Sequence, residues 1–194
     1  MTLLSQPSIV VLAGPNGAGK TTAAPFLLRD ALEVREYVNA DPLAAGLSAF
    51  EPESVAIAAG RVMLARINEL ARRRISFGFE TTLASRTFAP WIRARRGEGY
   101  AVHLVFLWLA SPELAIARVA RRVEMGGHAV PDEVVKRRYA AGLRNFFGLY
   151  RPLVTTWQAF DNSEPSGPRR IARGEAGGVV LILQSDLWEP LVRQ

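Results

Sequence analysis

The residues most able to do chemistry stand near the start of the chain, in the stretch GPNGAGKTT. Gly14, Gly19, Lys20 and Thr21 match the pattern G-x-x-x-x-G-K-[ST], between an apolar run and a helix-compatible run. In this setting backbone N–H groups cradle phosphates, the lysine reaches the β- and γ-phosphates, and the threonine hydroxyl binds Mg²⁺. The sequence therefore predicts a loop that binds ATP and Mg²⁺, rather than a glycine-rich turn without a ligand. The residues expected at the nucleotide are Gly14, Pro15, Asn16, Gly17, Ala18, Gly19, Lys20, Thr21 (also the metal ligand) and Thr22.

Several parts of other nucleotide-binding proteins are missing from the sequence. It has no N-K-x-D motif, which GTPases use to read the base, and no signature loop of an ABC-type ATPase. No long apolar strand ends in a clear Walker B aspartate. Small kinases often lack these parts, so the pattern favours phosphoryl transfer to a bound acceptor.

The acceptor side of such a reaction needs a carboxylate that takes the proton of the acceptor hydroxyl. The predicted strand 35–39 runs into VNADPLA, and ligands of open α/β sheets bind beyond the carboxyl ends of the strands. Asp41 is therefore a candidate catalytic base, and Asn39 is a candidate substrate contact. The alternatives are that Asp41 caps a short helix starting at Pro42 and that Asn39 is a turn residue.

A second polar cluster follows the predicted strand 76–79. Glu80, Thr81 and Thr82 come directly after that strand, so we expect them on the same rim as Asp41. Glu80 is a candidate for binding substrate hydroxyls or a water on Mg²⁺, and the threonines are candidate substrate contacts. The alternative is a surface loop with a threonine cap.

Arginines on either side of a Gly-Gly break form a third cluster. Arg118 and Arg122 are four residues apart and share a helix face, and Arg138 lies on the helix after the break. Cationic groups that close over ATP would neutralise charge on the moving phosphoryl group and exclude water. Residues from about 118 to 145 are therefore a predicted lid, with Arg118 on ATP and with Arg122 and Arg138 as catalytic residues. The alternative is an exposed pair of basic helices.

Two further residues stand in loops near these clusters. His128 follows the Gly-Gly break and is a candidate contact to substrate, although a lone loop histidine often has no such role. Asn162 follows the last parallel strand, where a kinase of this kind often holds adenine. The alternative for Asn162 is a simple Asx turn.

Composition narrows the setting in which this chemistry would take place. The 194 residues carry a net charge of +6, and every basic residue except Lys20 and Lys136 is arginine. A basic chain attracts phosphate-bearing substrates, whereas nucleic acid is disfavoured because basic and aromatic residues do not interleave. The sequence has no cysteine and no apolar run that could span a bilayer, which excludes disulfides and thiolate metal sites and argues against membrane contact. With no signal peptide apparent, we expect a cytoplasmic protein.

Strand and helix patterns alternate along the chain, which favours a parallel sheet with helices on both faces. Strands are predicted over residues 8–13, 35–39, 76–79, 101–109 and 156–160, and helices over 19–31, 52–74, 88–97, 111–123 and 131–147. Two short strand-like pieces and an end helix follow. We expect an α/β fold in one domain over residues 1–194, with a C-terminal appendage from about 164 to 194.

Taken in order, these motifs resemble the zeta-toxin-like family of P-loop kinases. The matching pieces are GPNGAGKTT, VNADPLA, FETTLAS, GGHAVP followed by RRYAAGLRN, and FDNS. The resemblance implies a three-layer α/β/α fold whose five parallel strands have the order 2-3-1-4-5, as in adenylate and shikimate kinases. It also implies that Asp41 is the base, that Glu80 and the threonines bind the acceptor, and that lid arginines bind the γ-phosphate. An antitoxin protein is the partner that the resemblance suggests.

Characterised zeta toxins phosphorylate UDP-N-acetylglucosamine on a sugar hydroxyl. This chain is shorter, and it reads NADP where those toxins have an aspartate-aromatic-arginine pattern. Our first hypothesis is an ATP-dependent kinase for a hydroxyl of a small molecule, such as this nucleotide sugar. The second is a nucleotide-binding switch or toxin–antitoxin module without a phosphorylated product. The third is a polynucleotide kinase, which would bind RNA with a steep salt dependence.

Overall fold

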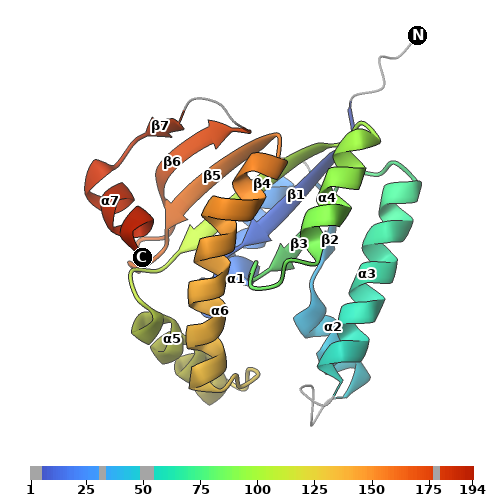
Figure 1. Ribbon diagram of the computed structural model, residues 1–194. Helices are drawn as coiled ribbons and strands as arrows, with labels where there is room; N and C mark the ends of the chain where they lie inside the picture. Colours follow the sequence, from blue (N-terminus) through green and yellow to red (C-terminus); the bar gives the residue numbers. More distant parts are fainter. Residues whose placement is uncertain (1–5, 31–33, 49–54, 177–179) are drawn as a thin grey trace.

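The computed structural model describes residues 6–30, 34–48, 55–176 and 180–194 of the chain (Figure 1). The strands are β1 (Ser8–Ala13), β2 (Glu36–Val38), β3 (Phe77–Thr81), β4 (Ala101–Trp108), β5 (Thr156–Asp161), β6 (Arg169–Glu175) and β7 (Val180–Ile182). The α-helices are α1 (Lys20–Ala24), α2 (Ala40–Leu47), α3 (Ala56–Arg72), α4 (Phe88–Gly97), α5 (Pro112–Glu124), α6 (Asp132–Asn145) and α7 (Ser185–Arg193). Two π-helical segments cover Pro25–Asp30 and Phe146–Tyr150, and a short 3-10 helix covers Arg151–Leu153.

The strands form a single sheet in the order β2-β3-β1-β4-β5-β6-β7. The first five strands are parallel, which confirms the predicted order 2-3-1-4-5. Strand β1 lies at the centre, where Ala13 is in register with Thr81 of β3 and Phe106 of β4. The carboxyl ends of these strands therefore meet at one edge of the sheet, and the loop after β1 opens onto that edge.

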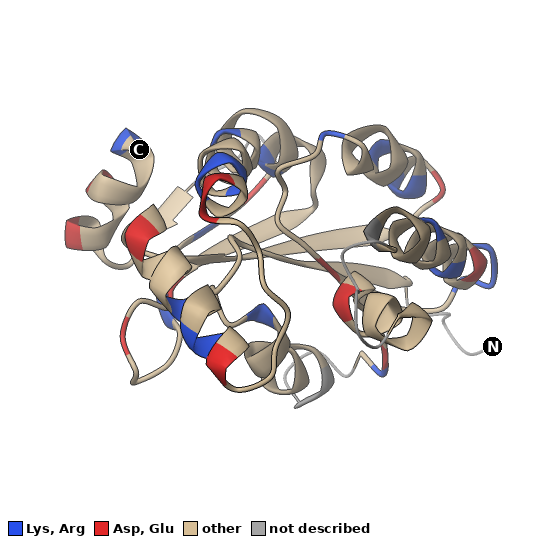
Figure 2. Cartoon of the chain, turned by 90° about the horizontal axis from the view of Figure 1, so that it is seen from below, with Lys and Arg blue, Asp and Glu red and all other residues tan. Residues whose placement is uncertain are grey.

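Helices cover both faces of the sheet, as right-handed crossovers between parallel strands require (Figure 1). In the view of Figure 1, α3, α4 and α6 lie in front of the sheet and α1 lies behind it. Figure 2 views the molecule from the side of the strands' carboxyl ends and shows basic and acidic residues on the surrounding helices. The middle layer is apolar: the β1 residues Ile9 to Ala13 are at most 1% exposed.

The sheet has two strands more than the five predicted parallel ones, because the C-terminal appendage extends it. Strand β6 pairs antiparallel with β5, and β7 pairs antiparallel with β6. Without β6, the outer edge of β5 would present unpaired backbone groups, which added strands satisfy. Helix α7 then packs beside β6, with Trp188 stacked on Trp157 of β5 at a ring distance of 6.0 Å.

Several predicted boundaries shift for local reasons. The first helix was expected over residues 19–31, but α1 ends at Ala24 and a π-helical segment begins at Pro25, whose missing N–H interrupts the α-helical hydrogen bonds. Helix α2 begins at Ala40 rather than Pro42, because the side chain of Asn39 accepts a hydrogen bond from the Asp41 N–H. Asn39 is therefore the cap, and the alternative that Asp41 caps this helix is wrong. Residues 31 and 52–54, at the ends of two predicted helices, lie outside the described residues.

The predicted cap of α5 is confirmed. The side chain of Ser111 accepts a hydrogen bond from the Leu114 N–H at 3.1 Å, and Pro112 occupies the first helical position. Strand β3 runs two residues past its predicted end, so Glu80 and Thr81 belong to the strand itself. This extension places the Glu80 side chain beside the loop after β1.

Candidate functional site

The loop after β1 has the backbone geometry of a phosphate cradle. Gly14 and Gly19 adopt φ angles of 144° and 76°, which L-residues with a side chain rarely reach. A Cβ on Gly14 would lie 2.2 Å from the Leu107 carbonyl oxygen, and a Cβ on Gly19 would lie 2.7 Å from Nδ2 of Asn162. Both positions therefore require glycine, and the loop leads directly into the N-terminus of α1.

Lys20 is the first residue of α1, and its side chain folds back over the loop. Its Nζ donates hydrogen bonds to the carbonyl oxygens of Gly14 at 3.0 Å and Pro15 at 2.8 Å. It also lies 3.7 Å from Glu80. Burial lowers the pKa of Lys20, while the negative charges of Glu80 and Asp41 oppose that shift. The ammonium group therefore lies inside the loop, bonded to its carbonyl oxygens.

Glu80 is the centre of a hydrogen-bonded cluster at the ends of β2 and β3. One of its carboxylate oxygens accepts hydrogen bonds from the Thr21 hydroxyl at 3.0 Å, the Tyr37 hydroxyl at 2.6 Å and the Asn39 amide at 2.9 Å. The Glu80 side chain is only 10% exposed. Burial, together with the charge of Glu80, raises the pKa of Tyr37, so this phenol stays protonated and remains a donor.

Sequence reasoning missed two features of this cluster. Glu80 lies next to last in β3, the strand beside β1, and contacts Thr21, which is where a Walker B carboxylate would act; the sequence pattern considered was that of an aspartate only. Tyr37 was not predicted at all. The alternation in EYVN would have placed it on the same face of its strand as Asn39, but only the strand order reveals that Glu80 lies beside both.

Asp41 is held quite differently from Glu80. It lies in the first turn of α2 and is exposed, and its backbone N–H bonds to the Asn39 side chain at 2.9 Å. Within the described ranges, no hydrogen bond or ion pair engages its carboxylate. The carboxylate is therefore free to meet a group that enters the cleft.

One cavity of about 890 Å³ gathers most of the predicted site residues. Its lining includes Asn16, Gly17, Gly19, Lys20, Thr21, Thr22, Asn39, Asp41, Glu80, Thr81, Thr82, Arg118, Arg122 and Arg138. The threonines also have local roles, because Thr81 Oγ1 accepts from the Leu83 N–H and Thr82 Oγ1 from the Ala84 N–H. The loop, both carboxylates and the arginines of α5 and α6 thus face a single space.

The three arginines reach the cleft from α5 and α6 and make different contacts. Arg138 reaches the loop with a long 3.5 Å contact from Nη1 to the Asn16 side chain. Arg122 donates to the His128 carbonyl oxygen at 2.8 Å, and its Nε is buried without a hydrogen-bond partner. Arg118 donates to the carbonyl oxygens of Asn162 and Ser163 at 2.6 Å each. Arg122 and Arg138 therefore keep donors available, whereas Arg118 braces the segment after β5.

Asn162 and His128 do not line the cavity. The Asn162 amide donates to the Ala18 carbonyl oxygen at 2.8 Å, so this side chain supports the phosphate loop from outside. His128 presents its carbonyl oxygen to Arg122 at the turn between the two helices. The proposed contacts of Asn162 to adenine and of His128 to substrate stay predictions.

Over the described part of the chain, no three His, Cys, Asp or Glu side chains converge into a metal-binding group. Among the described helices, none is long and apolar enough to cross a bilayer.

Comparison with known proteins places the chain in a family. The family model described as Zeta toxin matches residues 2–156, which leaves the end of β5, β6, β7 and α7 outside the match. An uncharacterized protein of Haemophilus influenzae is 28% identical over 134 residues, covering 69% of this chain and 94% of that protein.

Solved structures share the fold. The AvrRxo1-ORF1:AvrRxo1-ORF2 complex with sulphate ions matches with a TM-score of 0.78 at 19% identity, over 96% of this chain and 63% of the matched chain. A chain of the PezAT toxin-antitoxin system of Streptococcus pneumoniae matches with a TM-score of 0.68 at 14% identity, over 98% and 80% of the two chains. Shikimate kinase from Acinetobacter baumannii matches with a TM-score of 0.52 at 20% identity, over 84% and 87%. The chain thus spans less than two thirds of the AvrRxo1 chain that it matches.

Proposed function

Because the chain belongs to the zeta toxin family and has the fold of P-loop kinases, we propose that it transfers the γ-phosphate of ATP to a hydroxyl group of a small molecule. The observation that carries this proposal is the shared cavity, in which Lys20, Thr21 and Glu80 face Asp41. A phosphate cradle and a free carboxylate in one space are what phosphoryl transfer to a hydroxyl requires.

In the proposed reaction the acceptor oxygen attacks the γ-phosphorus while the bond to the bridging oxygen of ADP breaks. Asp41 takes the hydroxyl proton, since its carboxylate is exposed to the cleft and free of competing hydrogen bonds. Lys20 and the loop N–H groups hold the β- and γ-phosphates in line with the acceptor. ADP then leaves with the charge of the broken bond.

The donor set at Thr21 and Glu80 fits Mg²⁺. The Thr21 hydroxyl and the Glu80 carboxylate are oxygen donors 3.0 Å apart, and Mg²⁺ is commonly held by one or two such groups together with substrate phosphates. When bound, Mg²⁺ would neutralise charge on the phosphates during transfer. Tyr37 and Asn39 hold Glu80 in place for this role.

Arg122 and Arg138 are the proposed lid residues that stabilise the transferring phosphoryl group. Both line the cavity, Arg122 from α5 and Arg138 from α6. The predicted lid, residues 118–145, consists of the second half of α5, the turn after it and α6. Arg118 lies on the same face of α5 but is committed to the segment after β5, so we assign it a supporting role at the nucleotide. Thr81 and Thr82 line the acceptor side of the same space.

Two further aspects of the proposal concern partner and location. The matched PezAT chain belongs to a toxin-antitoxin system, and we propose by analogy that an antitoxin protein binds this chain. The cytoplasm, where ATP is available, is the proposed location.

The kinase proposal is tested with purified protein, γ-labelled ATP and Mg²⁺ against a panel of hydroxyl compounds that includes UDP-N-acetylglucosamine and other nucleotide sugars. We expect label on a hydroxyl of at least one compound. Label that appears only as free phosphate, and only when a protein partner is added, would contradict the proposal and favour a nucleotide-driven switch.

A further inference from the structure

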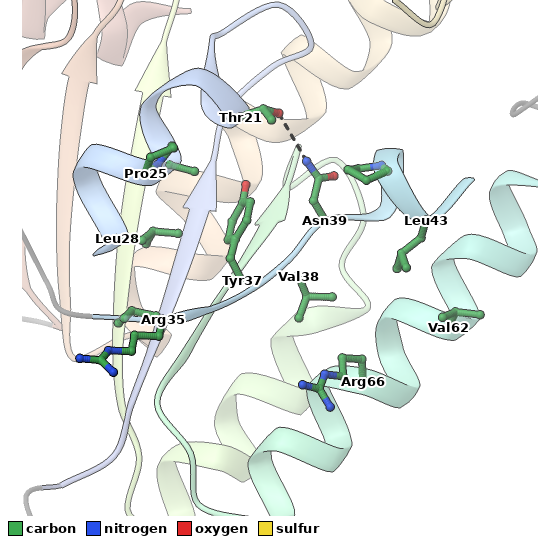
Figure 3. A pocket seen from close by; sticks show the side chains of 13 residues that line it. Thr21, Pro25, Leu28, Arg35, Tyr37, Val38, Asn39, Leu43, Val62 and Arg66 are labelled. Carbon is green, nitrogen blue, oxygen red and sulfur yellow. Dashed lines mark hydrogen bonds between the residues drawn. The ribbon is translucent and has the colours of Figure 1, made fainter. Parts of the chain in front are cut away.

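A second cavity, of about 710 Å³, lies along β2 beside the nucleotide cleft (Figure 3). This volume falls in the range of about 300–1,000 Å³ that is typical of small-molecule pockets. Its walls come from α1 and the π-helical segment on one side of β2 and from α2 and α3 on the other. The apolar wall residues include Ala24, Pro25, Leu28, Val38, Leu43 and Val62.

This cavity adjoins the cleft at its inner end. Thr21 and Asn39 line both spaces, and a 3.4 Å contact joins their side chains, as Figure 3 shows. Asp41 faces the cleft, whereas Leu43, two residues further along α2, faces the second cavity. A molecule whose hydroxyl reaches Asp41 therefore has the second cavity as its neighbour on the Asn39 side.

The distribution of polar groups decides what chemistry the cavity accepts. At the inner end, the polar atoms of Thr21, Tyr37 and Asn39 are already engaged with Glu80. The charged lining residues are Arg35, just before β2, and Arg66, which is paired with Glu36 and Glu69 at 2.9 Å each. Elsewhere the walls are aliphatic, so hydroxyl or phosphate groups buried there would lack hydrogen-bond partners. An apolar group would instead gain from leaving water.

We propose that this cavity is an acceptor subsite for an apolar group, aliphatic or aromatic. The acceptor is then an amphiphilic alcohol, whose hydroxyl meets Asp41 while its apolar part lies between Leu28 and Val62. This inference rests on the proposed kinase activity and narrows its substrate class, because a fully hydrophilic sugar would leave the cavity unused.

The test uses 1-butanol, 1-hexanol and 1-octanol as probes, since they share one hydroxyl and differ only in chain length. Binding is measured by calorimetry with a non-hydrolysable ATP analogue present, and transfer is measured with γ-labelled ATP and Mg²⁺. Affinity should rise by about fourfold for each methylene that enters an apolar site. The rate of phosphorylation per molar alcohol should rise with it.

A matched pair of variants separates this cavity from general apolar binding. Val62 lines the cavity and is 44% exposed on α3, so Val62→Trp fills the space at a position that tolerates a larger side chain. Val192 is 50% exposed on α7, beyond the opposite part of the sheet, and Val192→Trp is the control. We expect Val62→Trp to abolish the chain-length dependence and Val192→Trp to preserve it, with nucleotide affinity equal in both.

Three results would overturn the inference. These are affinity that does not depend on chain length, unchanged dependence in Val62→Trp, and binding that strengthens while phosphorylation does not. The last result would assign the cavity to another apolar ligand, such as side chains of a partner protein. Nucleotide binding by the wild type is measured in parallel. If the wild type does not bind nucleotide, the proposed kinase is overturned. If it binds nucleotide but alcohols have no effect, only the subsite is overturned.

Discussion

Two carboxylates face the same cleft, and the protein holds them in opposite ways. Glu80 lies in a buried strand and accepts hydrogen bonds from Thr21, Tyr37 and Asn39 at 2.6–3.0 Å. Asp41 lies in the first turn of α2, exposed, and within the described ranges no partner holds its carboxylate. A fixed carboxylate suits a metal site, because its oxygens are already placed. A free one suits proton transfer, because it can accept a proton without breaking other bonds.

The largest effect that this comparison predicts is that of Asp41→Asn. The amide keeps the size of the side chain but cannot take the hydroxyl proton, so kcat should fall by about 10²- to 10⁴-fold. ATP affinity, measured by calorimetry, should change little, because Asp41 is exposed and, among the described residues, no hydrogen bond or ion pair joins its side chain to the phosphate loop. Asp186→Asn is the control, since Asp186 is also exposed in the first turn of a helix. Undiminished turnover in Asp41→Asn would remove this residue as the base.

Lys20 lies between the two carboxylates, and its removal should affect binding as well as rate. We expect Lys20→Ala to lower kcat/KM by about 10²- to 10³-fold, because a positioned charge on the phosphates is lost. Nucleotide affinity should fall in the same variant. Lys136→Ala is the matched control, because Lys136 is the only other lysine in the sequence and pairs with Glu133 on the exposed face of α6. Equal nucleotide affinity in Lys20→Ala and wild type would contradict the phosphate-loop assignment.

The local geometry of the phosphate loop could be predicted from the sequence, for a physical reason. The phosphate loop is a local structure: its glycines, its lysine and the strand before it are adjacent in the chain, so spacing alone defines their geometry. The order of the parallel strands followed from the family resemblance. The capping of α5 by Ser111 was local too, and it is confirmed.

The other parts of the site and of the sheet could not be predicted, because they depend on contacts between residues that are distant in the sequence. The role of Glu80 requires that β3 lie beside β1, which brings Glu80 to Thr21 although the two residues are 59 positions apart in the sequence. It also requires that β2, which contains Tyr37 and leads to Asn39, lie on the other side of β3. Strand β6 reads RRIARGE, with only two buried apolar residues, so its apolar pattern was too weak to predict a place in the sheet. Asn162 illustrates the same limit, because its support of Ala18 spans 144 residues.

A change at the fixed carboxylate should act on the metal rather than on proton transfer. Glu80→Gln keeps the shape but removes the charge, so Mg²⁺ affinity at a fixed ATP concentration should weaken by about 10- to 100-fold. The loss of a charged acceptor for buried donors should also destabilise the fold by about 1–3 kcal/mol. Mn²⁺ binding by electron paramagnetic resonance reports the first effect, and thermal unfolding reports the second. Glu36→Gln, at a half-exposed ion pair with Arg66, is the control. Wild-type metal affinity in Glu80→Gln would leave Glu80 with a purely structural role.

The smallest effect, and the sharpest test of how Glu80 is held, is expected for Tyr37→Phe. The substitution removes only the hydroxyl that donates to Glu80 at 2.6 Å, while the ring that lines the apolar cavity remains. Since Asn39 and Thr21 still bond the carboxylate, the Mg²⁺ concentration for half-maximal activity should rise by about tenfold or less, with kcat at saturating Mg²⁺ near the wild-type value. Tyr100→Phe removes a hydroxyl that bonds to the carbonyl oxygens of Ala71 and Ile75, away from the cleft, and should leave the Mg²⁺ dependence unchanged. If Tyr37→Phe lowered kcat at saturating Mg²⁺ as strongly as Asp41→Asn, then Glu80 and Asp41 would act as one unit, and the division between a fixed and a free carboxylate would fail.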